Sequence, residues 1–140
     1  MKDLQLEDFP IKSYDKLRYA DTDRLGHVNN AVFSTFLETG RVEFFFNSSN
    51  PIVSKETSFV IASLKLDFVK EVHWPGQVEI GTGVIKIGNS SIVLFQMIFQ
   101  ENICVAKAET VIVQTHKEKK GSHPLSDQAK EVISQMLLKN

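Results

Sequence analysis

The chain has 140 residues, of which 42% are hydrophobic and 24% charged, and its formal net charge is −1. This length and composition predict a single domain spanning residues 1–140, with a core large enough to fold without a disulfide or a metal. The small net charge argues against nucleic acid or an anionic membrane as a partner. No apolar window approaches the ~20 residues of a membrane span and no signal-like run opens the chain, so we expect a cytoplasmic protein.

The first half of the chain is predicted to contain one short strand and one long helix. Residues 1–13 are mixed in character and predict an irregular lead-in, and residues 14–20 alternate weakly, as in a short strand. From Asn30 onward, apolar residues recur at helical spacing over several turns, which predicts a long and largely buried helix. The run N-S-S-N-P at 47–51 supplies capping residues and a breaker, so we expect the helix to end there.

Beyond this breaker the hydrophobic period becomes that of strands. Four apolar, β-branched runs span residues 58–70, 78–87, 92–100 and 103–115. The breaks between them have hairpin length, which predicts that successive strands are antiparallel neighbours. Both faces of the third run are apolar, as in a strand buried on two sides, and the single cysteine, Cys104, is expected to be a small core hydrophobe.

A short amphipathic helix capped by Ser126 or Asp127 is predicted to follow the last strand. The order of these elements is one strand, a long helix, four strands and a short helix. This order favours an α+β fold in which one long helix packs on one antiparallel sheet.

Most of the polar chemistry is concentrated between Asp21 and Asn30, directly before the long helix. This stretch holds two carboxylates, an imidazole, two amides and a glycine. The first turn of a helix leaves N–H groups unpaired and carries the positive end of the helix dipole, so a developing anion is stabilised near Asn30. The Asp23 carboxylate lies upstream on the same loop. A carboxylate beside an anion site suggests acyl chemistry.

The order of these residues resembles a known family signature. From Asp21 to Asn30 the chain reads D-T-D-R-L-G-H-V-N-N, and Phe33, Glu38 and Arg41 follow. This pattern resembles the hotdog-fold thioesterases, specifically the 4-hydroxybenzoyl-CoA thioesterase-like acyl-CoA thioesterases. The resemblance implies an antiparallel sheet wrapped around the long helix, a homodimer or homotetramer, an acyl-CoA substrate and no cofactor. Acyl length, the choice between CoA and a carrier protein, and the pathway are left open.

The resemblance also implies roles for individual residues. Asp23 matches the family's catalytic carboxylate, acting either as nucleophile on the thioester carbonyl or as general base on a water. The backbone N–H of Asn30 matches the oxyanion donor. His27 is a candidate for contacting the substrate or ordering the loop, and is equally compatible with a structural role; Asn29 is a substrate-binding candidate that also suits local loop bonding.

A second candidate substrate contact lies in the predicted hairpin at 88–91. Its G-N-S-S sequence resembles a family turn beside the CoA phosphates or pantetheine, which makes Asn89, Ser90 and Ser91 substrate-binding candidates. The same residue types are common in any hairpin. Departures from the family outline fall at Phe33, where Tyr is common, at Lys70 and Glu71, where many relatives have Arg-Pro, and at Gln77, where Asp or Glu is usual.

Other classes of site are disfavoured or kept as alternatives. The start of the loop mimics a calcium motif, but Leu25 and Val32 stand where oxygen ligands belong. The sequence has no zinc-binding motif of the H-E-x-x-H type and no G-x-S-x-G elbow, so no metal site and no serine esterase are predicted. A hotdog hydratase or dehydratase, and a non-catalytic acyl-CoA-binding protein, remain the alternatives to a thioesterase.

Overall fold

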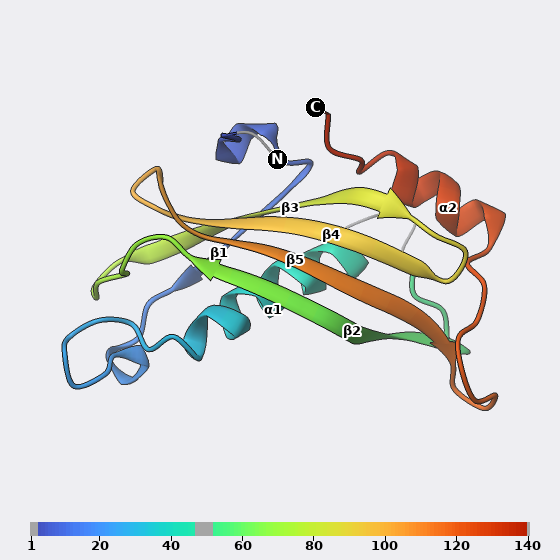
Figure 1. Ribbon diagram of the computed structural model, residues 1–140, viewed down its shortest axis with the longest axis horizontal. Coiled ribbons are helices and arrows are strands. Elements are labelled where there is room, and N and C mark those ends of the chain that lie inside the picture. Colours follow the sequence, from blue (N-terminus) through green and yellow to red (C-terminus); the bar gives the residue numbers. More distant parts are fainter. Residues whose placement is uncertain (1–2, 47–51, 140) are drawn as a thin grey trace.

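The computed structural model describes residues 3–46 and 52–139, and these form one antiparallel sheet with a long helix against it (Figure 1). The described helices and strands are η1 (Leu6–Asp8), β1 (Ile11–Lys16), η2 (Tyr19–Asp21), α1 (Val32–Phe46), β2 (Thr57–Phe68), β3 (Gln77–Ile87), β4 (Ser91–Gln100), β5 (Ile103–His116) and α2 (Asp127–Ser134). The α+β layout predicted from the sequence is confirmed.

The strand order in the sheet is β1-β3-β4-β5-β2, with every pair antiparallel. Successive strands from β3 to β5 are hairpin neighbours, as predicted. The predicted hairpin between β2 and β3 is wrong, because β2 pairs with β5 and β3 pairs with β1. The connection between β2 and β3 is therefore a crossover from one edge of the sheet to the far side.

The first strand lies earlier in the chain than predicted. It covers Ile11–Lys16, and residues 17–20, which were expected to extend it, turn away from the sheet. The reason is local, since the Arg18 N–H donates to the Asp21 carboxylate at 2.9 Å and η2 starts immediately afterwards. The resulting turn leads the chain into residues 21–30, the polar loop, at one end of the sheet.

Helix α1 buries one side against the sheet. Its buried positions include Phe33, Phe36, Leu37, Gly40 and Phe44, at the helical spacing seen in the sequence. Ser34, Thr35 and Glu38 are exposed, so the helix is amphipathic rather than buried all round. The predicted end of the helix at 47–51 lies outside the described residues.

Strand β4 is buried on both faces, as predicted. Leu94, Gln96 and Ile98 alternate with Phe95, Met97 and Phe99, and all six are buried. The second set joins a cluster with Phe9 and Leu138, from the two ends of the chain, so the face turned away from α1 is also covered.

In the described part of the chain, no helix combines the length and apolarity needed to cross a membrane.

Candidate active site

The loop before α1 is folded into a tight antiparallel turn. Thr22 and Val28 form an isolated bridge, and the Asp23 N–H donates to the His27 carbonyl at 2.7 Å. Gly26 sits at the tip with φ of 85°, a left-handed conformation that glycine adopts without steric cost. This turn brings Asp23 and His27 side by side.

The base of the loop is fixed by Asp21, the first carboxylate of the motif. Its side chain is buried, with 3% exposure, and accepts hydrogen bonds from the Arg18 N–H, Nε and Nη2 at 2.9, 3.1 and 2.8 Å. These hydrogen bonds and the negative charge of Asp21 raise the pKa of the Arg18 guanidinium. Asp21 is therefore engaged in holding the loop.

Asp23, the second carboxylate, is exposed and only partly engaged. One oxygen, Oδ1, accepts hydrogen bonds from the N–H groups of Leu25 at 2.9 Å and His27 at 3.2 Å. Within the described residues, the other oxygen, Oδ2, has no hydrogen-bond partner. Asp23 thus stabilises its own turn with one oxygen while the other is available to a ligand.

The N-terminus of α1 begins two residues later than predicted, at Val32. Asn29, rather than Asn30, supplies the side-chain acceptor at this turn, since its Oδ1 accepts from the Ala31 N–H at 2.9 Å. Local loop bonding therefore occupies the Asn29 side chain, and its contact with substrate stays a prediction.

One backbone donor at this helix entrance is left free. The N–H groups of the surrounding residues are all paired: Val28 with Val72 O, Asn29 with Asp21 O, Ala31 with Asn29 Oδ1, Val32 with Asn29 O and Phe33 with Asn30 O. Among residues 3–46 and 52–139, no atom accepts a hydrogen bond from the Asn30 N–H. The Asn30 N–H, which the family resemblance matched to the oxyanion donor, is therefore available to a ligand.

The three candidates Asp23, His27 and Asn30 line one pocket of about 380 Å³. Its other walls are Leu25, Val28, Phe33, Phe68, Val69, Lys70 and Glu71. The pocket therefore joins the polar loop and the start of α1 to the end of β2 and the crossover that follows it. Apolar side chains and charged groups of both signs surround the same space.

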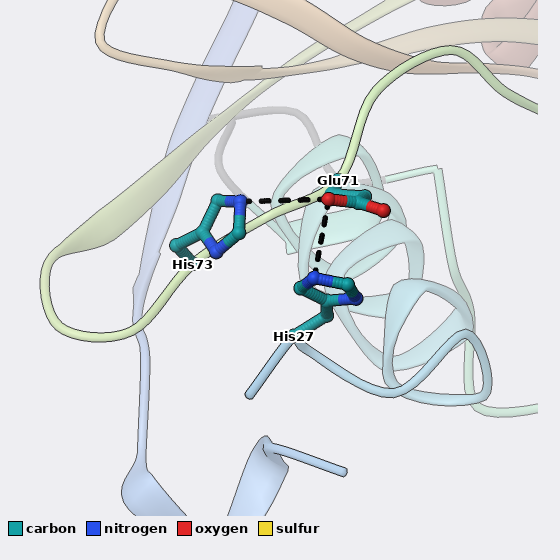
Figure 2. A group of neighbouring side chains, drawn as sticks. All are labelled: His27, Glu71 and His73. Atoms are coloured by element: carbon teal, nitrogen blue, oxygen red, sulfur yellow. Dashed lines mark ion pairs between the residues drawn. The ribbon is translucent and has the colours of Figure 1, made fainter. Parts of the chain in front are cut away.

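The sequence analysis did not predict Glu71 or His73 as site residues. The His27 Nε2 lies 3.2 Å from the Glu71 Oε2, and the His73 Nε2 lies 3.7 Å from the same oxygen (Figure 2). The departure from the family outline at Lys70 and Glu71 was the available signal. It could not be placed, because the segment was assigned to a hairpin rather than to a crossover beside His27.

The predicted hairpin contacts Asn89, Ser90 and Ser91 are not part of this pocket. They lie at the turn between β3 and β4, whereas the Val28–Val72 hydrogen bond and the His27–His73 bridge place the polar loop beside the segment just before β3. The eleven residues of β3 separate the two places by roughly 35 Å at the usual rise of ~3.3 Å per residue. Figure 1 shows them at opposite ends of the sheet. Within one chain they do not meet.

Cys104 offers no nucleophile to this site. It lies at the start of β5 and is partly buried, and burial raises the pKa of its thiol. A thiol kept protonated is a poor nucleophile, which agrees with its expected role as a small hydrophobe.

A model of the thioesterase-like superfamily matches residues 17–136. The chain belongs to this superfamily. The expected enzyme class, a thioester hydrolase, is thereby confirmed. The matched residues include the polar loop, α1 and every strand after β1, so the family assignment covers the whole pocket.

Individual thioesterases agree with this assignment. The acyl-CoA thioesterase YbgC of Helicobacter pylori is 34% identical over 84 residues, which are 60% of this chain and 63% of that protein. A thioesterase from Thermus thermophilus, whose structure is described as complexed with coenzyme A and Zn, is 27% identical, with a TM-score of 0.81 over 93% of this chain and 96% of that one. A predicted thioesterase from Bacillus stearothermophilus has a TM-score of 0.84 at 24% identity, over 93% and 98% of the two chains. The hotdog fold expected from the sequence is confirmed.

Proposed function

We propose that this thioester hydrolase acts on acyl-CoA and releases the free acid and CoA. The observation that carries the proposal is that Asp23, His27 and the Asn30 N–H, which has no acceptor among the described residues, meet around one pocket. The name of the Helicobacter pylori relative and the coenzyme A in the Thermus thermophilus structure support the same substrate class. The proposed site needs no cofactor, because a carboxylate and an amide suffice for thioester hydrolysis.

Asp23 is proposed to supply the carboxylate by one of two routes. As a nucleophile, a carboxylate oxygen bonds to the thioester carbon, the C–S bond breaks, CoA leaves as a thiolate, and water then hydrolyses the acyl anhydride. As a general base, the carboxylate takes a proton from a water whose oxygen bonds to the same carbon, and the thiolate again leaves. The Oδ2 oxygen, which has no partner among the described residues, suits either route.

The Asn30 N–H is proposed to hold the carbonyl oxygen as it becomes negative. A backbone donor costs no reorganisation at this moment because the turn already fixes it, and the positive end of the α1 dipole acts in the same direction. Loss of one such donor typically costs about 3 kcal/mol of transition-state stabilisation. The His27 imidazole faces the same pocket and is proposed to contact the substrate.

A second candidate function is a hydratase or dehydratase acting on an acyl thioester. The observation that favours it is the 3.2 Å approach of the His27 Nε2 to the Glu71 Oε2, since a histidine paired with a carboxylate can move protons. This candidate makes His27 essential and Asp23 dispensable. The two functions are therefore separable by substitution.

We also propose that the active form is a homodimer or homotetramer. The support comes from β2, a twelve-residue strand at the edge of the sheet whose Val60, Ile61 and Phe68 side chains are about half exposed. Assembly would also give Asn89, Ser90 and Ser91 a role, because their turn can reach an acyl-CoA only when the substrate sits in the pocket of another chain. Their contact with CoA remains part of the proposal.

The decisive experiment compares thiol release by the wild type, Asp23→Asn and Asp127→Asn on short-chain, long-chain and aromatic acyl-CoAs. Asparagine keeps an Oδ1 that can accept from the Leu25 and His27 N–H groups, so the turn is preserved while the reactive charge is lost. We expect Asp23→Asn to lower the turnover at least 100-fold. Asp127→Asn, an exposed position in the first turn of α2, should match the wild type.

Other outcomes identify the alternatives. Equal thiol release by Asp23→Asn and the wild type overturns the proposed role of Asp23. Hydration of an enoyl-CoA that is lost in His27→Ala and kept in Asp23→Asn would establish the hydratase. Binding of acyl-CoA without any turnover would establish a non-catalytic binding protein.

A further inference from the structure

Three metal-ligating side chains converge beside the pocket. They are His27, Glu71 and His73, and one ligand atom of each lies within 4.8 Å of the other two (Figure 2). His27 comes from the polar loop, while Glu71 and His73 come from the crossover between β2 and β3. His27 and Glu71 also line the pocket, so the cluster stands at its rim.

The spacing within the cluster is close to the spacing between two ligands of one metal ion. The distances from the Glu71 Oε2 are 3.2 Å to the His27 Nε2 and 3.7 Å to the His73 Nε2. A charge-assisted hydrogen bond would bring these atoms to about 2.7–2.9 Å. Ligands of tetrahedral zinc, each about 2.0–2.1 Å from the metal, lie roughly 3.3 Å apart. The two separations measured from Glu71 are therefore within about 0.5 Å of that spacing.

Hydrogen bonds fix the backbone segments that carry the two imidazoles. His27 and His73 form an antiparallel bridge, and the adjoining Val28 N–H donates to the Val72 carbonyl at 2.8 Å. The Gln100 side chain clamps the other side of His73, because its Nε2 donates to the His73 carbonyl at 2.8 Å and its Oε1 accepts from the His73 N–H at 3.3 Å. The two rings pack edge to face with centroids 5.0 Å apart. Because these segments are ordered before an ion binds, the entropic cost of forming the site is reduced.

The cluster is also accessible and lacks compensating positive charge of its own. The side chains of Glu71 and His73 are each 61% exposed and that of His27 is 28% exposed, so an ion can enter from solvent. With neutral imidazoles the cluster carries one negative charge. A divalent cation would add favourable charge to this rim.

We propose that His27, Glu71 and His73 form a zinc site whose remaining coordination positions face solvent at the pocket rim. Two imidazole nitrogens and one carboxylate oxygen are a donor set that suits zinc, whereas magnesium prefers oxygen ligands alone. The site shares His27 and Glu71 with the lining of the proposed thioesterase pocket, but it does not rest on Asp23 or on the Asn30 N–H. Zinc binding to these residues can be measured without an activity assay.

The test is calorimetric titration of the chelator-treated protein with zinc chloride. We expect one ion per chain in the wild type, and an affinity at least tenfold weaker in Glu71→Gln and in His73→Ala. Both side chains are exposed, so neither substitution should unfold the protein, and circular dichroism checks this. Magnesium chloride should give no binding, and cobalt chloride should give the visible absorption of a tetrahedral site that disappears in the same variants.

The chain offers a matched control in its second histidine pair. His116 and His123 lie with ring centroids 5.2 Å apart, but His116 uses its Nδ1 to accept from the Glu118 and Lys119 N–H groups. In the described part of the chain, no carboxylate completes a three-ligand cluster with this pair. The double variant His116→Ala and His123→Ala should bind zinc as the wild type does.

Three results would overturn the proposal. They are the absence of zinc binding by the wild type, unchanged affinity in both Glu71→Gln and His73→Ala, and loss of the ion only in the His116 and His123 double variant. All three are results of zinc titration, whereas the proposed thioesterase is tested by thiol release. Failure of one proposal is therefore distinguishable from failure of the other.

Discussion

Two aspartates in one short motif have opposite environments. Asp21 is buried and receives three hydrogen bonds from Arg18, whereas Asp23 is exposed and keeps one oxygen without a partner among the described residues. The difference arises because the chain turns at Arg18 and then folds back on itself at Gly26. Asp21 thus acts as part of the scaffold and Asp23 is the residue presented to a ligand.

This division of roles predicts different effects of substitution. Asp21→Ala should lower the free energy of unfolding by about 1–3 kcal/mol, because it leaves the Arg18 N–H without its acceptor and empties a buried position. Asp23→Asn should change it by less than about 0.5 kcal/mol, since the site is exposed and asparagine keeps the turn. Urea denaturation of both variants measures the difference. Equal destabilisation by the two substitutions would contradict the assignment.

The proximity of the candidate residues was predictable from the sequence, but their surroundings were not. Asp23, His27 and Asn30 lie in one contiguous motif, so their proximity follows from chain connectivity. Glu71 and His73 are distant in sequence and reach His27 only because the crossover pairs Val72 with Val28. No local pattern in either segment encodes that contact. The pairing of distant segments depends on the packing of the whole sheet.

At the scale of elements, the closest approach of α1 to the sheet is set by Gly40. A Cβ built at this position would lie 2.5 Å from the Gln96 Nε2 and 2.7 Å from the Thr82 Oγ1. The Gln96 amide cannot move aside freely, because it is fully buried and its Nε2 donates to the Leu37 carbonyl and the Thr82 hydroxyl, each at 3.0 Å. Glycine in mid-helix is therefore explained by packing rather than by helix propensity.

Gly40→Ala consequently tests the packing of α1. We expect it to lower the free energy of unfolding by about 1–3 kcal/mol through overpacking, although alanine favours the helix by up to ~1 kcal/mol. Ser34→Ala, at an exposed position of the same helix, provides the control and should be neutral or slightly stabilising. Thermal denaturation followed by circular dichroism compares them. A stabilised Gly40→Ala variant would show that the sheet yields to the added methyl group.

The elements themselves followed from hydrophobic periodicity, while their pairing did not. The four strands after α1 begin and end within two residues of the predicted ranges, because each apolar run is bounded by turn residues. The segment between β2 and β3 has only eight residues, 69–76, and still crosses the sheet. Its Val69 and Lys70 N–H groups donate to the Val105 carbonyl on β5, so the chain stays beside β5 before it turns toward His27.

At the scale of the whole molecule, the two edges of the sheet differ sharply. The edge strand β1 has six residues, while the edge strand β2 has twelve. Short edges resist further pairing, whereas a long apolar edge is a template for it. On β2 the residues Val60 and Ile61 are 49% exposed and Phe68 is 50% exposed. This contrast is the reason for proposing β2 as the edge where a second chain would extend the sheet.

Lysine substitution on β2 tests the proposed assembly. Light scattering coupled to size exclusion should give the wild type at least twice the 15.8 kDa chain mass, and the double variant Val60→Lys and Ile61→Lys a lower multiple, because desolvating two added charges opposes the contact. Ile103→Lys, equally exposed at the start of β5, should leave the mass unchanged. If the wild type contains four chains and the double variant two, β2 forms one of two interfaces. A monomeric wild type, or loss of mass only in Ile103→Lys, would contradict assembly through β2, because the apolar edge would then stand in water unpaired.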